Sequence, residues 1–163
     1  MAPPRITKIT PFLWFQTGAR DAAAFYTGIF PDSRIDRVTT MPAAPPPDPG
    51  ATTTVVEFTL AGDPFIAMTS PTTETFNQTI SFTVLCDDQA EIDRYTEALS
   101  RGGSLLPCGW LRDRFGVSWQ ITPRALFDMI AAPDRAAAKR ATEAMLTMQK
   151  LDLAALRAAF AGS

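Results

Sequence analysis

The sequence predicts an α+β protein made of two βαβββ modules and a helical C-terminal extension. The same order of strand and helix patterns occurs twice, and Tyr26–Phe30 aligns with Tyr95–Leu99. Hairpin signals at Gly62 and Gly116 occupy the same place in each half. Each module is too small to bury its own sheet face, so we expect the two to pack together. The predicted parts of this one domain are residues 1–69, 70–123 and 124–163.

The first half reads as strand, helix and three strands. Phe12 and Trp14 share one face of the first strand, and apolar residues then recur at the spacing of an amphipathic helix that Pro31 ends. The segment Met41–Gly50 contains five prolines and no periodicity, so we predict a loop. A flap over a pocket is the alternative for this loop. The expected elements are a strand at 9–15, a helix at 21–30, strands at 33–40 and 52–60, a turn at 61–64 and a strand at 65–69.

The second half repeats that order after a polar linker at 70–78. Asp87 or Asp88 is a suitable N-cap for the helix, and Arg101–Gly103 ends it. A tight turn at Asp113–Gly116 leads into the last strand, because Gly116 accepts a positive φ. The expected elements are strands at 80–86, 104–106, 110–112 and 117–123 and a helix at 88–99.

The chain is helical after Pro123. We expect a short helix at 125–131, a longer one capped by Asp134 and a third capped by Asp152. This extension packs against the sheet edges or against a second subunit. Met145 and Met148 form a stripe that we interpret as core or interface rather than as a cofactor site.

Composition excludes several functions. Of 163 residues, 46% are hydrophobic and 20% are charged, with a net charge of −2. No basic cluster favours nucleic acid, and no apolar run is long enough for a signal peptide or a membrane span. Cys86 and Cys108 show no metal or disulfide spacing, so we expect a reducing cytoplasm.

The sequence has no histidine. The commonest metal ligand and the commonest acid–base side chain are therefore both missing. Serine–histidine–aspartate and cysteine–histidine arrangements are excluded for the same reason.

Several motifs resemble the vicinal oxygen chelate superfamily, and within it the PhnB-like branch whose members often carry the label 3-demethylubiquinone-9 3-methyltransferase. The resemblance covers nearly the whole chain. We expect the paired modules to form two facing curved sheets with a cleft between them, the default place for a ligand, and we expect a homodimer. The matching motifs are Ile9–Phe15, Phe25–Tyr26, Phe30–Ser33, Phe76–Asn77 before Ile80–Phe82, Cys108–Leu111, Asp113–Arg114, Gly116–Gln120 and Met148–Leu153.

The resemblance also implies four positions for metal ligands, which carry over to Pro11, the Phe65–Met68 strand, Thr79 and Gln120. Only Gln120 offers a useful donor, and one neutral oxygen does not hold a divalent ion. Glu57 is the one carboxylate inside a strand. We therefore expect no metal and no cofactor. No glycine-rich turn follows a parallel strand, so the methyltransferase label finds no support either.

We predict that the chain binds a small apolar or aromatic molecule in the cleft. The alternatives are an enzyme of the same superfamily, with Glu57 or Cys108 as the weaker catalytic candidates, and a structural dimer module that recruits a partner through residues 124–163. The candidate ligand-binding residues are Trp14, Phe65, Met68, Asn77, Ser81, Trp110, Trp119 and Gln120.

Most of these residues also have a purely structural interpretation. For Gln120 a ligand contact and an amide satisfied by backbone are equally weighted, whereas Trp110 and Trp119 are more often core. Cys108 reads as an inert thiol, since only two arginines stand near it in the sequence. Asn77 fits linker chemistry.

Overall fold

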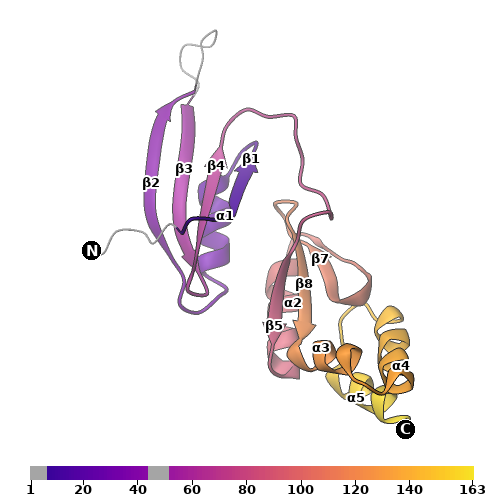
Figure 1. The fold of residues 1–163 in the computed structure, drawn as a ribbon. Coiled ribbons are helices and arrows are strands. Elements are labelled where there is room, and N and C mark those ends of the chain that lie inside the picture. Colours follow the sequence, from indigo (N-terminus) through magenta and orange to yellow (C-terminus); the bar gives the residue numbers. More distant parts are fainter. Residues whose placement is uncertain (1–6, 44–51) are drawn as a thin grey trace. The chain divides into compact units, whose positions relative to one another are not determined.

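The computed structural model of the chain describes residues 7–43 and 52–163 (Figure 1). The chain forms two compact units, which divide between Thr75 and Phe76. Each unit contains a four-stranded sheet with a helix on it. The predicted α+β class and the repeated strand–helix–three-strand order are both confirmed.

The first unit contains a sheet in the order β1-β4-β3-β2. The β1 and β4 strands are parallel, and the other neighbours are antiparallel. The β3 strand is rich in threonine and valine, residues that fit a pleated, half-buried surface. The strands are β1 (Phe12–Phe15), β2 (Arg34–Pro42), β3 (Thr52–Leu60) and β4 (Asp63–Thr69).

Helix α1 (Ala19–Thr27) covers one face of this sheet. Its buried side includes Ala22 and Tyr26, and Val56 and Phe58 are buried on the adjacent β3 strand. The helix begins two residues before the predicted start, because Gly18 adopts a φ of 76° and turns the chain directly into it. It also ends earlier than predicted, at Thr27 rather than Phe30.

The second unit contains a sheet with the equivalent order, β5-β8-β7-β6, in which β5 and β8 are again parallel. Helix α2 (Gln89–Ser100) buries Ile92, Tyr95 and Leu99. The Asp88 carboxylate caps it by accepting from the Glu91 N–H at 2.9 Å, as predicted. The strands are β5 (Phe82–Cys86), β6 (Ser104–Leu105), β7 (Trp110–Arg112) and β8 (Ser118–Pro123), with the 3₁₀ turn η1 (Pro107–Gly109) before β7.

The hairpin between β7 and β8 is held by Asp113. The Asp113 carboxylate accepts from the N–H groups of Phe115 and Val117 at 2.8 and 3.0 Å, and from the Trp119 indole at 2.9 Å. Gly116 has a φ of 89° and closes the turn, as predicted.

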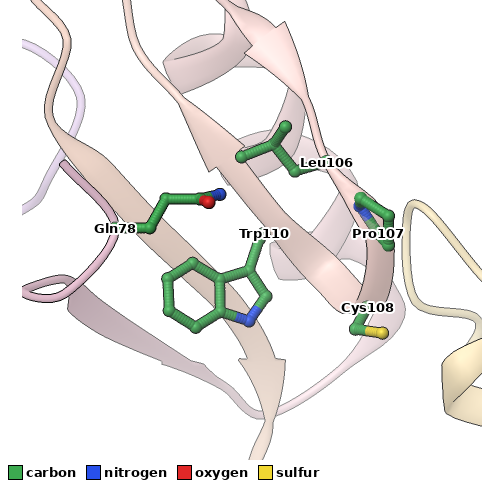
Figure 2. Close-up of a pocket in the computed structure, with 5 residues that line it drawn as sticks. All are labelled: Gln78, Leu106, Pro107, Cys108 and Trp110. Carbon is green, nitrogen blue, oxygen red and sulfur yellow. The ribbon is translucent and has the colours of Figure 1, made fainter.

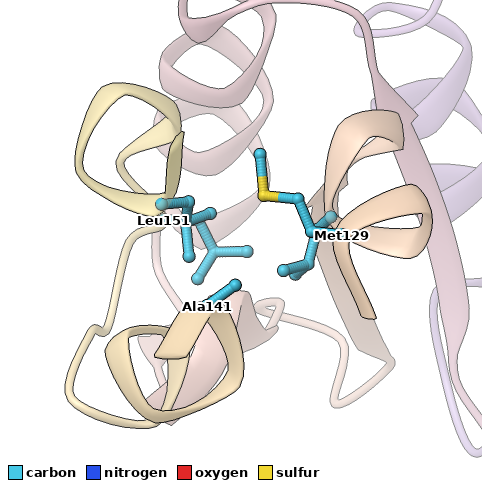
Figure 3. Packing of buried hydrophobic residues seen from close by; sticks show 5 residues of the cluster. Met129, Ala141 and Leu151 are labelled. Atoms are coloured by element: carbon cyan, nitrogen blue, oxygen red, sulfur yellow. The ribbon is translucent and has the colours of Figure 1, made fainter. Parts of the chain in front are cut away.

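The C-terminal extension forms α3 (Arg124–Ala131), α4 (Arg135–Leu146) and α5 (Leu153–Ala161). Asp134 and Asp152 cap α4 and α5 as predicted. The three helices gather at the carboxyl end of β8 (Figure 1). Figure 3 shows Met129, Ala141 and Leu151 pointing toward one another. The buried cluster there is Leu126, Met129, Ala141, Leu151 and Leu156. The extension is thus an integral part of the second unit's core.

Several predicted boundaries differ in detail. The β2 strand continues through Met41 and Pro42 into the predicted loop, because their neighbours Thr53 and Thr52 extend the β3 ladder. The rest of that loop lies outside the described residues. The β4 strand starts at Asp63 rather than Phe65. Within the described part of the chain, no helix has both the length and the apolar composition needed to span a bilayer.

Candidate functional site

The alternation of β8 separates two sets of side chains. Trp119 and Ile121 point toward α2 and are buried, with Trp119 only 2% exposed. Gln120 pairs with Trp110 across the β7–β8 ladder, so both residues lie on the opposite face. Trp119 therefore does not join Gln120 on one surface, although the sequence had placed both in one cleft. Instead it packs on the Phe82 ring at 5.4 Å and donates to Asp113.

A cavity of about 200 Å³ lies beside Gln120. We call it the Gln120 cavity. The sheet supplies Trp110, Gln120 and Thr122, and the 3₁₀ turn supplies Cys108. The rest of the wall comes from the extension, as Leu126, Phe127 and Ile130 of α3 and Met145 of α4. The extension thus provides half of the lining residues.

Two polar groups of this cavity have hydrogen-bonding capacity to spare. Gln120 donates from Nε2 to Ser81 Oγ at 2.8 Å, which brings two predicted site residues together. No donor among residues 7–43 and 52–163 is bonded to its Oε1, and no acceptor there is bonded to the Trp110 indole N–H. Gln120 Oε1 and the Trp110 indole N–H therefore give the cavity at least one acceptor and one donor beside its largely apolar wall.

A second cavity, of about 220 Å³, shares Trp110 and Cys108 with the first. We call it the Gln78 cavity. Figure 2 shows the Gln78 amide beside the Trp110 ring, with Leu106 and Pro107 from the η1 side. The Cys108 thiol points away from the Trp110 ring in this view.

Cys108 and Gly109 connect these cavities to the extension. Both adopt positive φ, 63° and 79°. Their N–H groups donate to the carbonyls of Met148 and Gln149, each at 2.7 Å. A Cβ on Gly109 would lie 2.8 Å from the Ile121 carbonyl oxygen, so only glycine fits here.

Gln89 holds the same segment of the extension. Its Nε2 donates to the Leu151 carbonyl at 3.1 Å, and its Oε1 accepts from the Leu153 N–H at 2.8 Å. The extension is thus held by the Gln89 side-chain amide of α2 and by backbone N–H groups of η1.

The two cysteines differ in environment. Cys86 is buried in the second unit's sheet, and burial together with the nearby Glu91 carboxylate raises its pKa to about 12. The Cys86 thiol is therefore protonated at neutral pH. Cys108 is only half-buried and lines both cavities.

The predicted residues of the first unit lie on its own sheet. Trp14 pairs with Met68 across β1 and β4, on the face away from α1, and its indole donates to the Ser70 carbonyl at 2.9 Å. Phe65 instead pairs with Phe58 on the helix-covered face, with the ring centroids 5.4 Å apart. Phe65 therefore lies on the opposite face from Trp14 and Met68, so these three predicted residues do not line one surface.

Glu57 lies in the middle of the same open face and is 8% exposed. Arg37 donates to its Oε1 through both Nε, at 2.9 Å, and the terminal Nη2. The other oxygen, Oε2, is buried and has no hydrogen-bond partner in the described structure. A buried carboxylate oxygen without a donor is costly, so this group is set apart from the ordinary surface acids.

Asn77 has a local role. Its Oδ1 accepts from the backbone N–H of Thr79 at 2.9 Å, which is the geometry of an Asx turn. The side chain is exposed in the linker and lines neither cavity.

The sequence pattern missed the part of the site that the extension supplies. Leu126, Phe127 and Ile130 follow the strand of Gln120 after a few residues and have helical spacing, which is the signal that could have found them. Gln78 carried no such signal, because it is one polar residue in a polar linker.

Comparisons with known proteins agree with the fold. Residues 7–122 match the family model described as 3-demethylubiquinone-9 3-methyltransferase. The PhnB protein from Bacillus cereus is 33% identical, with a TM-score of 0.63, and the match covers 72% of this chain and 99% of that one. No curated protein matches significantly.

More distant structures share the fold alone. The fosfomycin resistance protein FosX from Listeria monocytogenes is 14% identical with a TM-score of 0.55, and the match covers 77% of this chain and 98% of that one. A protein from Pseudomonas aeruginosa is 22% identical with a TM-score of 0.56, over 72% of this chain and 98% of that one.

Proposed function

The chain belongs to the 3-demethylubiquinone-9 3-methyltransferase family of PhnB-like proteins, within the vicinal oxygen chelate superfamily, and from that premise we propose that it binds a small neutral aromatic molecule without a metal ion. The observation that carries the proposal is the Gln120 cavity. Its apolar wall suits a ring, and its free acceptor and donor suit one polar substituent. At about 200 Å³ it is smaller than the pockets of drug-sized ligands, so we infer a single-ring ligand.

The residues at the predicted ligand positions of this chain do not suit a metal ion. A FosX from Listeria monocytogenes has been solved with Mn(II). In this chain, the Pro11 carbonyl accepts from the backbone of Ile66, and the Thr79 hydroxyl is bonded to Asn77. Gln120 offers a metal ion only a single neutral oxygen ligand. No group of three or more cysteine, aspartate or glutamate side chains suitable for a metal occurs in the parts of the chain that the structure describes. The donor set therefore supports a metal-independent site.

Phenol is a suitable probe, because it combines one ring with a hydroxyl that both donates and accepts. We expect calorimetric titration to show saturable binding to the purified protein. Ile130→Trp places a larger side chain in the cavity and should weaken phenol binding by about tenfold or more. A tenfold loss corresponds to ~1.4 kcal/mol of binding free energy. Ile35→Trp is the matched control, since Ile35 is 36% exposed, Ile130 is 37% exposed, and Ile35 belongs to the first unit.

The polar part of the proposal has its own test. Gln120→Leu removes the amide acceptor and replaces the side chain with an apolar one of similar size. We expect it to weaken phenol binding about two- to tenfold, the equivalent of one hydrogen bond. Toluene binding, which needs no acceptor, should stay the same. Equal losses for phenol and toluene would show that Gln120 only shapes the wall.

Glu57 supports a second candidate function, an enzyme of the same superfamily. A buried carboxylate with one unpartnered oxygen is a possible proton acceptor once a substrate provides a donor. Glu57→Gln should then abolish turnover of a substrate while leaving phenol binding to the second unit intact. Cys108→Ser tests the other reactive candidate in the same assay.

The homodimer and the cytoplasmic location are further parts of the proposal. Light scattering coupled to size-exclusion chromatography reports the subunit count. A mass of about 35 kDa, twice the chain mass of 17.7 kDa, is expected. A mass equal to one chain would remove the dimer from the account.

A further inference from the structure

Trp110 is the one large side chain that lines both the Gln78 cavity and the Gln120 cavity. The remaining walls do not overlap apart from Cys108. The Gln78 cavity is bounded by the linker and the η1 side, and the Gln120 cavity by β8, α3 and α4. In Figure 2 the indole ring stands at the wall of the Gln78 cavity, and Cys108 points elsewhere.

We propose that Trp110 partitions one larger binding volume and thereby limits the ligand to a single ring. The inference rests on the proposed function and names the residue that sets its size selectivity. Each cavity alone falls short of 300 Å³, whereas the two together reach the range typical of drug-sized pockets. Removing the indole therefore changes the class of ligand that the protein accepts.

The backbone of Trp110 is fixed independently of its side chain. Its carbonyl accepts from the Leu106 N–H at 2.8 Å, and the residue pairs with Gln120 in the β7–β8 ladder. The indole N–H has no acceptor within the described segments, and the ring is only half-buried. Truncation of the side chain thus removes a partition without leaving a buried polar group unpaired.

The test compares phenol with N-phenyl-1-naphthylamine, a neutral fluorescent probe with three rings. Wild-type protein should bind phenol. Its affinity for the naphthylamine should be at least about tenfold lower than the affinity of the Trp110→Ala variant for the same probe. Phenol affinity should change by less than that, because most of its wall remains. Trp110→Phe should give an intermediate result, since its smaller ring leaves part of the partition.

Methyl NMR locates the probe. Leu106 lines only the Gln78 cavity and Leu126 only the Gln120 cavity. In Trp110→Ala, one equivalent of the naphthylamine should shift the methyl signals of both leucines. Phe12→Ala is the control for loss of an aromatic side chain, because Phe12 is 52% exposed in the first unit. It should keep the wild-type selectivity.

The outcomes separate this inference from the function beneath it. If wild-type protein does not bind phenol, the proposed function fails. If phenol binds but Trp110→Ala gains no affinity for the larger probe, only the partition is refuted. Equal binding of both probes by the wild-type chain also refutes the partition, and that result does not depend on whether a variant folds.

Discussion

The two units share one topology and use it differently. Both sheets run in the order first, fourth, third and second strand, with a parallel pair at the same place. In the first unit, β2 and β3 are nine residues each, and the described residues place no helix on the face that carries Trp14 and Glu57. In the second unit, β6 and β7 have only two and three residues, and helices α3 and α4 of the extension add cavity walls beside the sheet.

The difference teaches that repetition of a βαβββ unit does not repeat its site. The first unit offers a buried carboxylate paired with an arginine. The second offers an uncharged cavity that exists only because the extension is docked beside β8. If this comparison is correct, perturbations of the docking should act on the second unit alone.

The largest effect is expected from Gly109→Ala. The new Cβ would lie 2.8 Å from the Ile121 carbonyl oxygen and 2.9 Å from Leu151 Cγ, and φ is +79°. We expect a loss of about 3 kcal/mol in the stability of the second unit. Hydrogen exchange measured by mass spectrometry should place the loss in peptides from 76–163.

Gly62→Ala is the matched substitution in the first unit. Gly62 also has a positive φ, 86°, but among the described residues its Cβ would meet just the Asp32 carboxylate, at 3.1 Å. The expected cost is about 1 kcal/mol, confined to the first unit. Equal costs for the two alanines would remove the special role of the Gly109 docking turn.

The next effect should fall on the first unit. Arg37→Leu removes the one partner that the buried Glu57 carboxylate has among the described residues, so we expect a loss of about 2 kcal/mol, moderated by the exposure of Arg37. Arg101→Leu is the control, because the Arg101–Glu97 pair is exposed on both sides and should be worth little. Chemical denaturation of the two variants gives the difference, and a null result for Arg37 would mean that Glu57 is satisfied in another way.

The smallest expected effect is a pH-dependent contribution of Asp93 to the stability of the second unit. Hydrogen bonds from Lys150 and then from Gln89 lower the pKa of Asp93 below its ordinary value. A carboxyl group whose pKa is lower in the folded than in the unfolded state stabilises the folded protein at pH values above its unfolded pKa, which is near 3.9. That stabilisation is lost as the pH falls through the folded-state pKa. Asp93→Asn should therefore lower the melting temperature slightly at pH 7, and the difference from wild type should shrink below pH 4.

Asp128→Asn provides the comparison for that series. Asp128 is exposed on α3 and makes no ion pair with other described residues. The Asp128→Asn protein should have the melting temperature of wild type at pH 7. A difference at pH 7 that stays constant below pH 4 would assign the Asp93 effect to packing rather than to ionisation.

Local signals in the sequence were sufficient for the fold. Apolar periodicity, the caps at Asp88, Asp134 and Asp152 and the turn at Gly116 all act within a few residues, and each is found where predicted. Boundaries failed where a single glycine or a ladder partner decided them, as at Gly18 and Pro42.

The candidate site was harder to predict, because it depends on tertiary contacts. Strand alternation alone predicts that Trp119 and Gln120 lie on opposite faces of the sheet. The predicted ligand-binding set includes both, because it is based on residue type rather than on the face of the strand. The docking of Met148–Leu151 on Cys108 and Gly109 involves backbone groups, which leave no mark in side-chain patterns. The contribution of Phe127 and Ile130 to the cavity follows from that docking.

The central claim is that the second unit, and not the open face of the first, binds a small neutral aromatic molecule. Methionines labelled with ¹³C at the methyl group test it directly, because Met145 lines the Gln120 cavity and Met68 lies beside Trp14. On titration with phenol we expect a saturable shift of the Met145 signal and none of Met68. A Met145 signal that does not move, or a Met68 signal that moves with it at the same phenol concentration, would contradict the claim.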